Sequence, residues 1–543
     1  MGLPPQLIDI NGRPLRRVLN SGYSNSGASL SDPSLIGWPW QGGAAIDDID
    51  ANVDIIRQRA RDLYYNAPVI TTAINQLVNL IVGSGIKPIF TPDADVLGWT
   101  PEYTAEWKAI VKEEFEVAFV KDKECDAERR RNLYEQQELA LLLLLVEGDI
   151  FAALPMIERD GVEYDTRIQL VEADVVSDPQ DNTAAMYALP GTTVYKGIEV
   201  SQYGNELAYY IATQNPLQRL QPLVQNSTEL NQRRWIRIPL YGSNSGRYNM
   251  LHMARYVRPG QRRGISLLAP LIKTSKQFDR YTDAELQTAL LQTMQSLFVV
   301  TEMPDAFIGE MKGVISDARV RDSEIAWAPG SISAMLPGES IQTVTPTHPN
   351  SPYMSYVEER KMTMFAAMGV GLELGTFNFR NSYSSSRASL NMTEKVCDKY
   401  RSTLNNSLNT PLAHSWMDEA VARGRIPTPT SGYFEDPRIR RAYQHISWQG
   451  PAFPALDQLK DAQASAFMIS IGASTFERET ARLTGTDFFE NVAQIGRELQ
   501  AMCDAGMEML LKSPSQRSNE SFDGSEQENA GNQVETEITK QQP

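Results

Sequence analysis

Few cysteines and histidines are present, and neither type is spaced for cross-linking or metal binding. The 543 residues include three cysteines that lie far apart in the sequence: Cys125, Cys397 and Cys503. An odd and scattered set gives no disulfide framework, and it lacks the Cys-x-x-Cys spacing of metal sites. The four histidines show no metal-ligand spacing either. We therefore expect a protein of a reducing compartment that holds no metal or other cofactor.

Long apolar runs are also absent. The most apolar run covers only residues 139–146, whereas a membrane span needs roughly 18 residues or more. Residues 1–20 lack the apolar core of a secretory signal peptide. The sequence therefore predicts a soluble chain without a standard secretion signal and with no membrane partner.

Positive charge is in short supply. The chain has 51 basic and 67 acidic residues, for a formal net charge of −16. A sequence-specific duplex binder is usually basic, because neutralising phosphates drives its affinity. The composition therefore argues against a protein that grips DNA tightly over a large surface. An acidic surface suits a protein that handles DNA without adhering to it, and it equally suits simple solubility.

Catalytic motifs are missing, with one weak exception. There is no Gly-x-x-x-x-Gly-Lys-Ser/Thr loop for nucleotide phosphates and no Gly-x-Ser-x-Gly nucleophile turn. Asp305, Glu310 and Lys312 resemble the set in which a metal-dependent nuclease holds a divalent ion and positions a nucleophile. The gap between the carboxylates is short for that class, and a turn explains the residues as well. The main prediction is a non-enzymatic protein, with a nuclease as an alternative.

The N-terminal half combines helical and strand patterns. Residues 1–45 are rich in Gly, Ser, Pro and Asn and predict a mobile arm. Helices are expected up to Tyr65, over 70–81, from Thr100 onward, and up to Glu147 with Asp126 as N-cap. Strands are expected over 149–157, 167–172, 193–200, 207–212 and 235–241, the first two as a hairpin. This block predicts an α+β domain.

The remainder is predicted to be mainly helical. Residues 265–300 show a helical pattern of about 35 residues, or about 50 Å at 1.5 Å per residue. Residues 301–350 are punctuated by Pro and Gly and predict short strands and turns. Helices are expected over 353–368 and over 384–423 with a break at Pro411, and two or three more between 448 and 512. The polar, acidic tail at 513–543 is predicted to be disordered.

One basic cluster surrounds Pro259-Gly260. It consists of Arg255, Arg258, Arg262 and Arg263. Arginine contacts phosphate or pairs with carboxylates. In a chain this acidic, pairing with carboxylates of the same or a neighbouring subunit is favoured over contact with DNA phosphate. The four residues are therefore candidates for intersubunit or phosphate contacts, and pairing within the chain is favoured over phosphate in the same way as intersubunit pairing.

A loop between two helices is the most informative segment. A helical run ends at Gly369 and Gly371, a polar and aromatic loop follows, and a serine cluster at 382–386 begins the next helix. The segment 368–390 resembles the tunnel-loop region of the lambda-type phage portal proteins. In that family, a glycine-rich helix end leads into a loop and then into a helix that opens on a pattern similar to Tyr383-Ser-Ser-Ser-Arg-Ala388.

Other patches resemble the same family and follow in the family's order. They are residues 59–68 with the helix down to 86, residues 256–270, residues 336–339 with 346–350, and residues 448–457 with 472–475 and 485–487. The resemblance extends from about residue 55 to 510. It implies a mainly helical α+β subunit. Usually twelve such subunits form a ring through which DNA passes.

The resemblance also implies a division of the chain and a site. The implied regions are a mobile arm (1–45), an α+β wing (46–263), a stem helix (264–300), a clip (301–350), a second stem helix (351–369), a tunnel loop (370–384), a tunnel helix with wing return (385–447), crown helices (448–512) and an acidic tail (513–543). The implied channel residues are Phe377, Asn378, Phe379, Arg380 and Asn381.

The partners follow from the same resemblance. They are identical copies of the chain, the large subunit of the packaging terminase, the head–tail connector or adaptor, the major capsid or scaffold protein, and double-stranded DNA that passes without sequence recognition. The implied location is the portal vertex of the virion, reached by assembly in the host cytoplasm. An internal capsid scaffold protein is a second alternative, and it predicts that no closed ring forms.

Overall fold

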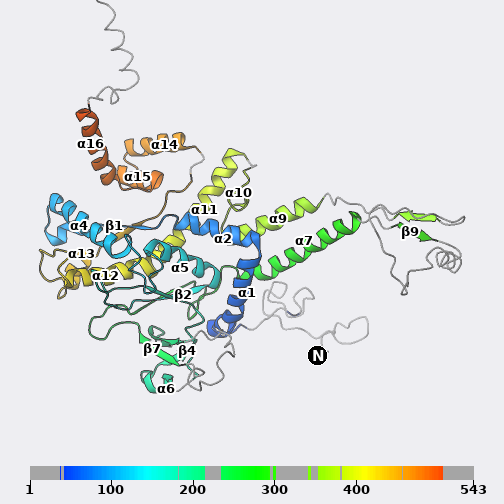
Figure 1. The fold of residues 1–543 in the computed structure, drawn as a ribbon, viewed down its shortest axis with the longest axis horizontal. Coiled ribbons are helices and arrows are strands. Elements are labelled where there is room, and N and C mark those ends of the chain that lie inside the picture. The colour runs from blue at the N-terminus through cyan, green and yellow to red at the C-terminus, as the bar shows by residue number, and fades with distance from the viewer. Residues whose placement is uncertain are drawn as a thin grey trace, which may run out of the picture.

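The computed structural model describes residues 37, 42–180, 183–213, 234–293, 297–300, 340–343, 352–379, 382–454 and 457–505. Several predictions therefore lie outside the described residues: nearly all of the arm at 1–45, most of 301–350 including Asp305, Glu310 and Lys312, and the tail at 513–543. In the described part, helices dominate and the strands form small antiparallel sheets (Figure 1). No described helix is long and apolar enough to cross a bilayer.

Two adjacent helices open the described part and pack on the central core. The elements are η2 (Ile46–Asp50), α1 (Val53–Asn66) and α2 (Pro68–Ile81). Pro68 at the first turn costs α2 no hydrogen bond, because the first amides of a helix have no intrahelical partner. Ile70, Ile74 and Leu77 recur on one face and are fully buried, which confirms the predicted helix.

The next helices show one cap that was predicted correctly and one that was not. The elements are β1 (Lys87–Phe90), α3 (Ala94–Leu97), α4 (Pro101–Phe119) and α5 (Leu133–Glu147). Thr100 caps α4 by accepting from the Tyr103 amide at 3.3 Å, as expected. The prediction that Asp126 caps α5 is wrong, because Asn132 and Glu135 form a reciprocal capping box there. Asp126 instead accepts backbone amides within the preceding loop.

Two antiparallel sheets follow. The strands are β2 (Asp149–Ala153), β3 (Gln169–Val171), β4 (Thr193–Tyr195), β5 (Ile198–Val200), β6 (Glu206–Ala212), β7 (Trp235–Pro239) and β8 (Met250–Ala254), with α6 (Thr183–Tyr187) between β3 and β4. The order is β3-β2-β8 in one sheet and β4-β5-β6-β7 in the other. Pairing of β2 with β3 confirms the expected hairpin. The strand predicted over 193–200 is two strands, because Lys196 and Gly197 both have positive φ and turn the chain.

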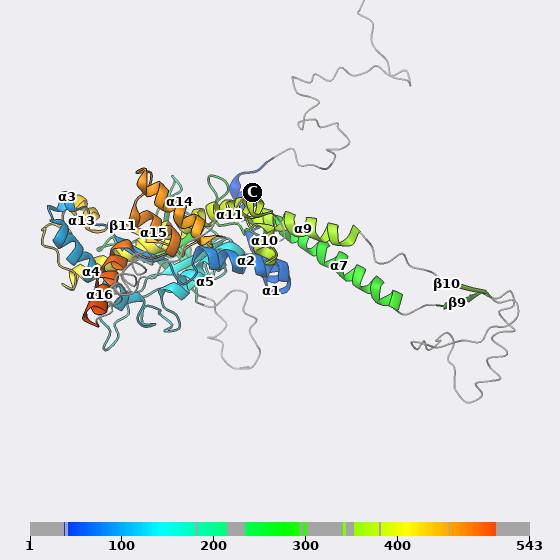
Figure 2. The same ribbon diagram turned by 90° about the horizontal axis from the view of Figure 1, so that it is seen from above.

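A pair of long helices leaves the main body. The elements are η3 (Ala269–Leu271), α7 (Ile272–Thr293), β9 (Leu297–Val300), β10 (Ser340–Thr343) and α9 (Pro352–Met368). Helices α7 and α9 run side by side and lead outward to β9 and β10 (Figures 1 and 2). Tyr281 on α7 contacts Tyr353 and Tyr356 on α9, with ring centroids 6.0 and 4.8 Å apart.

Helix α7 is shorter than predicted. It has 22 residues, or about 33 Å, and not the expected length of about 35 residues. Residues 297–300 are Leu-Phe-Val-Val, a β-branched and aromatic run that favours a strand. They form β9, which pairs with β10 from the far end of the following segment.

The C-terminal part returns to the body before a separate group of helices. The elements are α10 (Leu372–Thr376), α11 (Tyr383–Leu404), η4 (Asn405–Asn409), α12 (Thr410–Ala422), α13 (Pro437–Tyr443) and β11 (Ile446–Gln449). Near the expected break at Pro411 the helix has a π-helical turn, η4, which ends two residues before that proline. Strand β11 pairs antiparallel with β1, and Trp416 on α12 contacts Phe115 on α4. The core therefore joins the two halves of the sequence.

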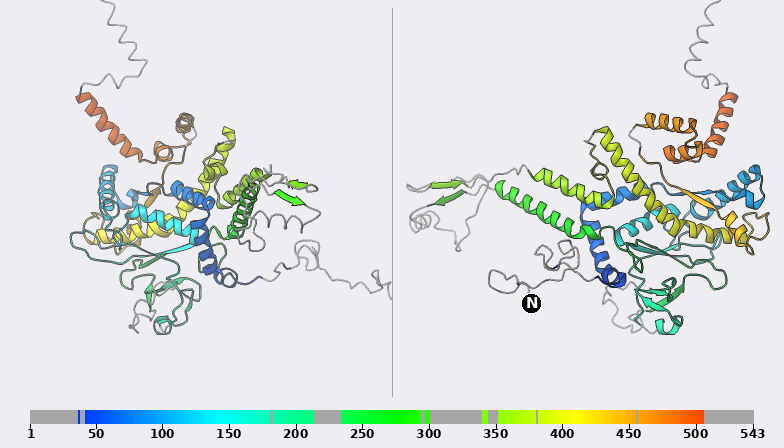
Figure 3. Two further views of the ribbon diagram at one scale, coloured as in Figure 1. Left: turned by 45° about the vertical axis from the view of Figure 1, so that its right-hand side comes forward. Right: turned by 180° about the vertical axis from the view of Figure 1, so that it is seen from behind.

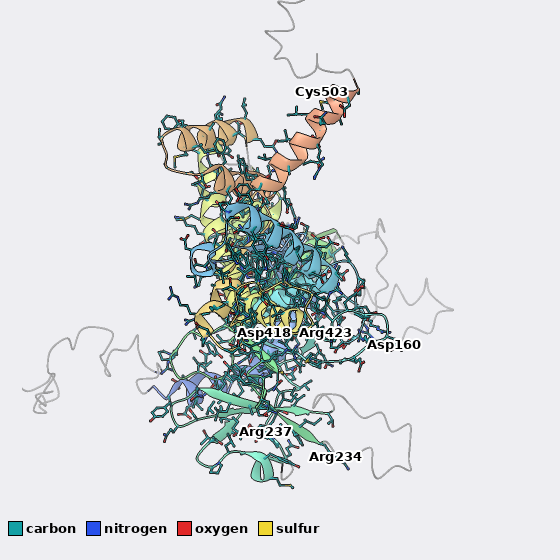
Figure 4. The ribbon with its side chains drawn as sticks, turned by 90° about the vertical axis from the view of Figure 1, so that its left-hand side faces the viewer. Asp160, Arg234, Arg237, Asp418, Arg423 and Cys503 are labelled. Atoms are coloured by element: carbon teal, nitrogen blue, oxygen red, sulfur yellow. The ribbon has the colours of Figure 1, made fainter. Side chains whose placement is uncertain are left out.

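Three helices complete the described chain, in agreement with the two or three predicted between 448 and 512. They are α14 (Gln458–Ser470), α15 (Phe476–Thr484) and α16 (Phe488–Asp504). They form a group at one end of the molecule (Figure 3). Cys503 at the end of α16 and Arg237 on β7 lie at opposite ends (Figure 4). No residue of α16 is buried.

Candidate functional site

The predicted channel loop is preceded by a short helix. Helix α9 ends at Met368, and α10 follows before the chain reaches Phe377. Phe377 has a φ of 54°, and its side chain is 66% exposed, while that of Phe379 is 50% exposed. Asn378 is exposed beside them, whereas Arg380 and Asn381 lie outside the described residues. The structure therefore places the two phenylalanines at an exposed tip.

The base of this loop is fixed by neighbouring helices. Ser386 of α11 donates its hydroxyl hydrogen to the carboxylate of Glu373 at 2.8 Å, although Glu373 is buried. The Gly371 amide donates to the Thr393 hydroxyl of α11 at 3.2 Å. A Cβ at Gly375 would lie 2.6 Å from the ring of Phe365 on α9, so only glycine fits there without displacing that ring. The loop thus has a packed base and an exposed tip.

A second candidate feature lies where the chain enters α7. We call it the charged junction, and it consists of Arg57, Arg61, Glu147, Asp149, Asp174, His252 and Arg263. Asp149 at its centre is fully buried. Its carboxylate accepts from Arg57 at 3.0 Å and from Arg263 at 2.5 Å. The junction connects α1 and β2 to the segment that becomes the first long helix.

Each buried charge in the junction has compensating partners. Arg263 also donates to the carbonyls of Ala173, Val176 and Lys196, at 2.6, 2.9 and 2.9 Å. Arg57 reaches Asp174 at 2.8 Å. Burying an unpaired charge is strongly unfavourable. The two arginines can therefore be buried only because these contacts compensate their charges.

The pKa values of the junction reflect competition between burial and charge. Burial alone would raise the pKa of Asp149, but Arg263 and Arg57 hold that pKa far below its usual range. Burial alone would lower the pKa of His252, but Glu206 and Asp149 raise it. The His252 ring stacks on Phe151 with centroids 4.2 Å apart, and Nδ1 lies 3.1 Å from Glu206. His252 is thus held between two carboxylates.

A close backbone crossing reinforces the junction. A Cβ at Gly264 would lie 1.9 Å from the carbonyl oxygen of Gly148, and one at Gly148 would lie 2.4 Å from the carbonyl carbon of Ile265. The Gly264 amide also donates to Asp149 at 3.3 Å. The end of α5 therefore touches the backbone that leads into α7, and glycine is required on both sides.

All four arginines of the predicted cluster have partners within the chain. Arg263 is buried in the charged junction and has a structural role there. Arg262 donates to the Gly204 carbonyl at 2.7 Å, and Arg255 to that of Ile265 at 3.3 Å. Arg258 pairs with Asp48 at 2.8 Å and remains 44% exposed. Intrachain pairing is therefore what the structure shows, and a role of Arg258 or its neighbours toward another subunit or phosphate stays a prediction.

Sequence reasoning did not find α10 or most of the charged junction. The apolar positions Leu372 and Leu374 were the available signal for α10. For the junction, the signal was Arg57 and Arg61 at i and i+4, which place two arginines on one helix face. Their carboxylate partners within the junction, Glu147, Asp149 and Asp174, lie 86 or more positions away, so local patterns do not reveal them.

Comparison with known proteins identifies the family. The family description "phage portal protein, lambda family" matches residues 31–401, more than half of the chain. The chain belongs to the lambda family of phage portal proteins. The match extends from before α1 into α11, so it includes the charged junction, the long helix pair and the loop after α10.

Relatives of known identity cover most of the chain. Portal protein B of Escherichia phage lambda is 24% identical over 478 residues, 83% of this chain and 84% of that protein. The portal protein of Escherichia phage N15 is 24% identical over 532 residues, 93% of this chain and 94% of that protein. The predicted membership of the portal family is thus confirmed.

Solved particle structures also match the chain. The neck of an empty gene transfer agent particle has a TM-score of 0.44 at 10% identity, covering 80% of this chain and 93% of the other. The virion of a native gene transfer agent particle has a TM-score of 0.41 at 11% identity, with the same coverage. The described elements themselves form the mainly helical α+β fold that was predicted for a portal-type subunit.

Proposed function

We propose that twelve copies of this chain form a ring at one vertex of a phage capsid and conduct double-stranded DNA during packaging and ejection. The family match over residues 31–401 carries this proposal. The family is a structural one, and DNA translocation needs a passage and docking surfaces from this subunit. The same proposal puts the protein in the virion, after assembly in the host cytoplasm.

The arrangement of the helices and strands suggests which elements form the stem, the wing and the clip of such a ring. Helices α7 and α9 leave the body as a pair, and the charged junction fixes the root of α7 to α1 and β2. We assign the pair to the stem, and residues 46–263 to the wing. Because β9 pairs with β10, the boundary between stem and clip is better placed after Thr293 than at residue 300. The clip would dock the terminase large subunit and later the head–tail connector.

The loop after α10 is assigned to the channel. Its base is packed against α9 and α11, whereas Phe377 and Phe379 are exposed. In a ring, these aromatic side chains would meet their counterparts from neighbouring loops and form a constriction with Asn378, Arg380 and Asn381. Two exposed aromatic side chains close together in the sequence offer an apolar surface for such contacts.

The charge balance supports passage of DNA without tight binding. A ring of twelve would carry a formal charge of −192 (12 × −16). A channel lined by part of this charge would repel duplex phosphates, so that DNA would slide through without tight binding. The capsid or scaffold protein would hold the ring at its vertex, where charges of the outer wing face protein.

The channel assignment is tested by replacing both loop phenylalanines with serine in one variant. Phe377→Ser with Phe379→Ser should leave ring assembly unchanged and lower the DNA packaged or retained per particle. The matched control replaces two exposed aromatic residues elsewhere, Tyr203 at 89% and Phe434 at 58% exposure. Loss of rings in the loop variant, or equal DNA content in loop and control variants, would contradict the assignment.

Two alternatives make different predictions. A metal-dependent nuclease using Asp305, Glu310 and Lys312 requires cleavage that Asp305→Ala abolishes. Absence of cleavage, or cleavage that survives Asp305→Ala, removes this alternative. An internal capsid scaffold protein requires the purified chain to form no closed ring. The family match favours neither alternative.

A further inference from the structure

The C-terminal helix group, residues 457–505, has no apolar core of its own. None of its apolar side chains is buried, and the buried residues in this range are Ser465 and Glu479. Ser465 donates to Glu479 at 2.7 Å and accepts from Arg482 at 2.7 Å, so polar contacts join α14 to α15. Helices in proteins obtain most of their stability by packing an apolar face. The group therefore needs a surface outside itself against which its apolar side chains are buried.

Helix α16 carries a continuous apolar seam. Its members recur at spacings of 4, 3, 4 and 3 residues: Phe488, Val492, Ile495, Leu499 and Met502. This is the heptad spacing with which one helix packs along another. The three central side chains, Val492, Ile495 and Leu499, are exposed by 50%, 52% and 41%. The α16 seam is therefore open, and its periodicity fits a helical partner.

A second apolar surface lies where α14 turns into α15. Phe467 and Ile471 are four positions apart at the end of α14, and their side chains are 63% and 58% exposed. Met468 beside them is 42% exposed, and Phe476 at the start of α15 is 58% exposed. We call these four residues the α14–α15 surface. It is helical like the α16 seam, but it is made of different residues.

The two surfaces lie toward opposite sides of the subunit. Figure 1 looks along the shortest axis of the chain, so this axis is vertical in Figure 2, where α14 lies toward one side and α16 toward the other. The side view agrees: α16, which ends near the labelled Cys503, lies on the opposite side of the group from α14 (Figure 4). Copies placed side by side along this axis bring α16 of one copy next to α14 of the next.

We propose that the α16 seam packs against the α14–α15 surface of a second copy of this chain. The inference rests on the proposed ring, in which copies stand side by side. A contact between two different surfaces repeats from copy to copy and closes a ring, whereas pairing of α16 with α16 uses one surface twice and stops at two copies. The proposed contact covers both open surfaces, and a helix of another protein would cover only one.

Assembly supplies what the helix group lacks within one chain. Helix α16 has 17 residues, and an isolated helix of about that length has little stability in water. Neighbouring copies held in a ring present the two surfaces to each other at an effective concentration far above that of free chains. The contact therefore forms on assembly, and it gives the group its apolar packing.

Photo-crosslinking in the full-length chain tests the proposal. A benzophenone amino acid replaces Ile495 on the seam in one variant and, as the matched control, Arg497 on the opposite face of α16 in another. Electron microscopy of the same samples counts closed rings, a denaturing gel separates linked copies from single chains, and mass spectrometry identifies the linked peptides. We expect position 495 to link two copies through peptides containing residues 467–476, at a yield several-fold above that from position 497.

A second set of variants guards against a coincidental link. Phe467→Ser with Ile471→Ser should lower the yield from position 495 several-fold. Tyr203→Ser with Phe434→Ser, at exposed positions outside both surfaces, should not. Links confined to single chains, links that join α16 to α16, or equal yields from positions 495 and 497 would overturn the proposal.

The same samples separate this contact from the proposed ring. Closed rings without links to residues 467–476 would overturn the contact and leave the ring. Copies linked through these residues but without closed rings would support the contact and overturn the ring.

Discussion

Replacing Asp149 by alanine tests the energetic role of the charged junction. The substitution leaves the guanidinium groups of Arg57 and Arg263 buried, at 1% and 2% side-chain exposure, without their shared carboxylate. Removing one partner of a buried ion pair typically lowers the free energy of unfolding by about 3–5 kcal/mol. For a unit of 150–250 residues, this corresponds to a fall in Tm of roughly 6–20 °C.

Asp54→Ala is the matched control. Asp54 contacts the same Arg57 at 3.3 Å, but its side chain is 54% exposed. Exposed ion pairs contribute about 0–1 kcal/mol, so Asp54→Ala should barely change Tm. Thermal unfolding of all variants is followed by circular dichroism at one protein concentration, because assembly changes the apparent stability. Equal Tm shifts for the two variants would refute the argument that burial determines how much these ion pairs contribute to the free energy of unfolding.

Acid adds a second check on the same substitution. The folded pKa of Asp149 is lowered, so its stabilisation is fully present above the unfolded pKa of about 3.9. It is lost as the pH falls through the folded pKa. The difference in stability between wild type and Asp149→Ala should therefore be constant from about pH 5 to 6, where His252 keeps its proton, and should narrow in strong acid. A difference that disappears already between pH 5 and 7 would contradict this assignment.

Two further substitutions test the same region. Because the folded pKa of His252 is raised, the stability that this residue contributes is fully present below its unfolded pKa of about 6.5 and is lost as the pH rises through the folded pKa. His252→Gln should therefore flatten the decline of Tm above pH 6.5. An unchanged dependence of Tm on pH would contradict this. Gly264→Ala should lower the free energy of unfolding by several kcal/mol, because the added Cβ would clash with Gly148. The control Gly496→Ala, in open space on α16, should raise it by about 0.5–1 kcal/mol. Equal changes in the free energy of unfolding would contradict the close backbone crossing.

Strongly periodic elements could be predicted from the sequence. The apolar face of α2 and the start of α4 at Thr100-Pro101 depend on local rules, and both are confirmed. The N-cap of α5 was missed although its signal is local. Asp126 and Asn132 are both capping residue types, but only Asn132 has a glutamate three residues later.

Ambiguous runs and distant contacts account for the remaining differences. Residues 297–300 are apolar throughout, so periodicity could not separate a helical end from a strand. These residues form a strand because they pair with β10, whose partner residues lie forty or more positions away. The charged junction combines Asp149 with residues 92 and 114 positions away, a distance over which local rules give no information. The position of the channel loop was predicted from family resemblance, and its packed base appeared only in the structure.

Electron microscopy of the purified full-length chain, with particles classified by rotational symmetry, tests the central claim most directly. The proposal predicts closed rings of twelve subunits with a central hole wide enough for a DNA duplex. The exposed loop after α10 should face that hole. Monomers or open aggregates at every salt concentration tested, or closed rings whose loop faces away from the hole, would contradict the account.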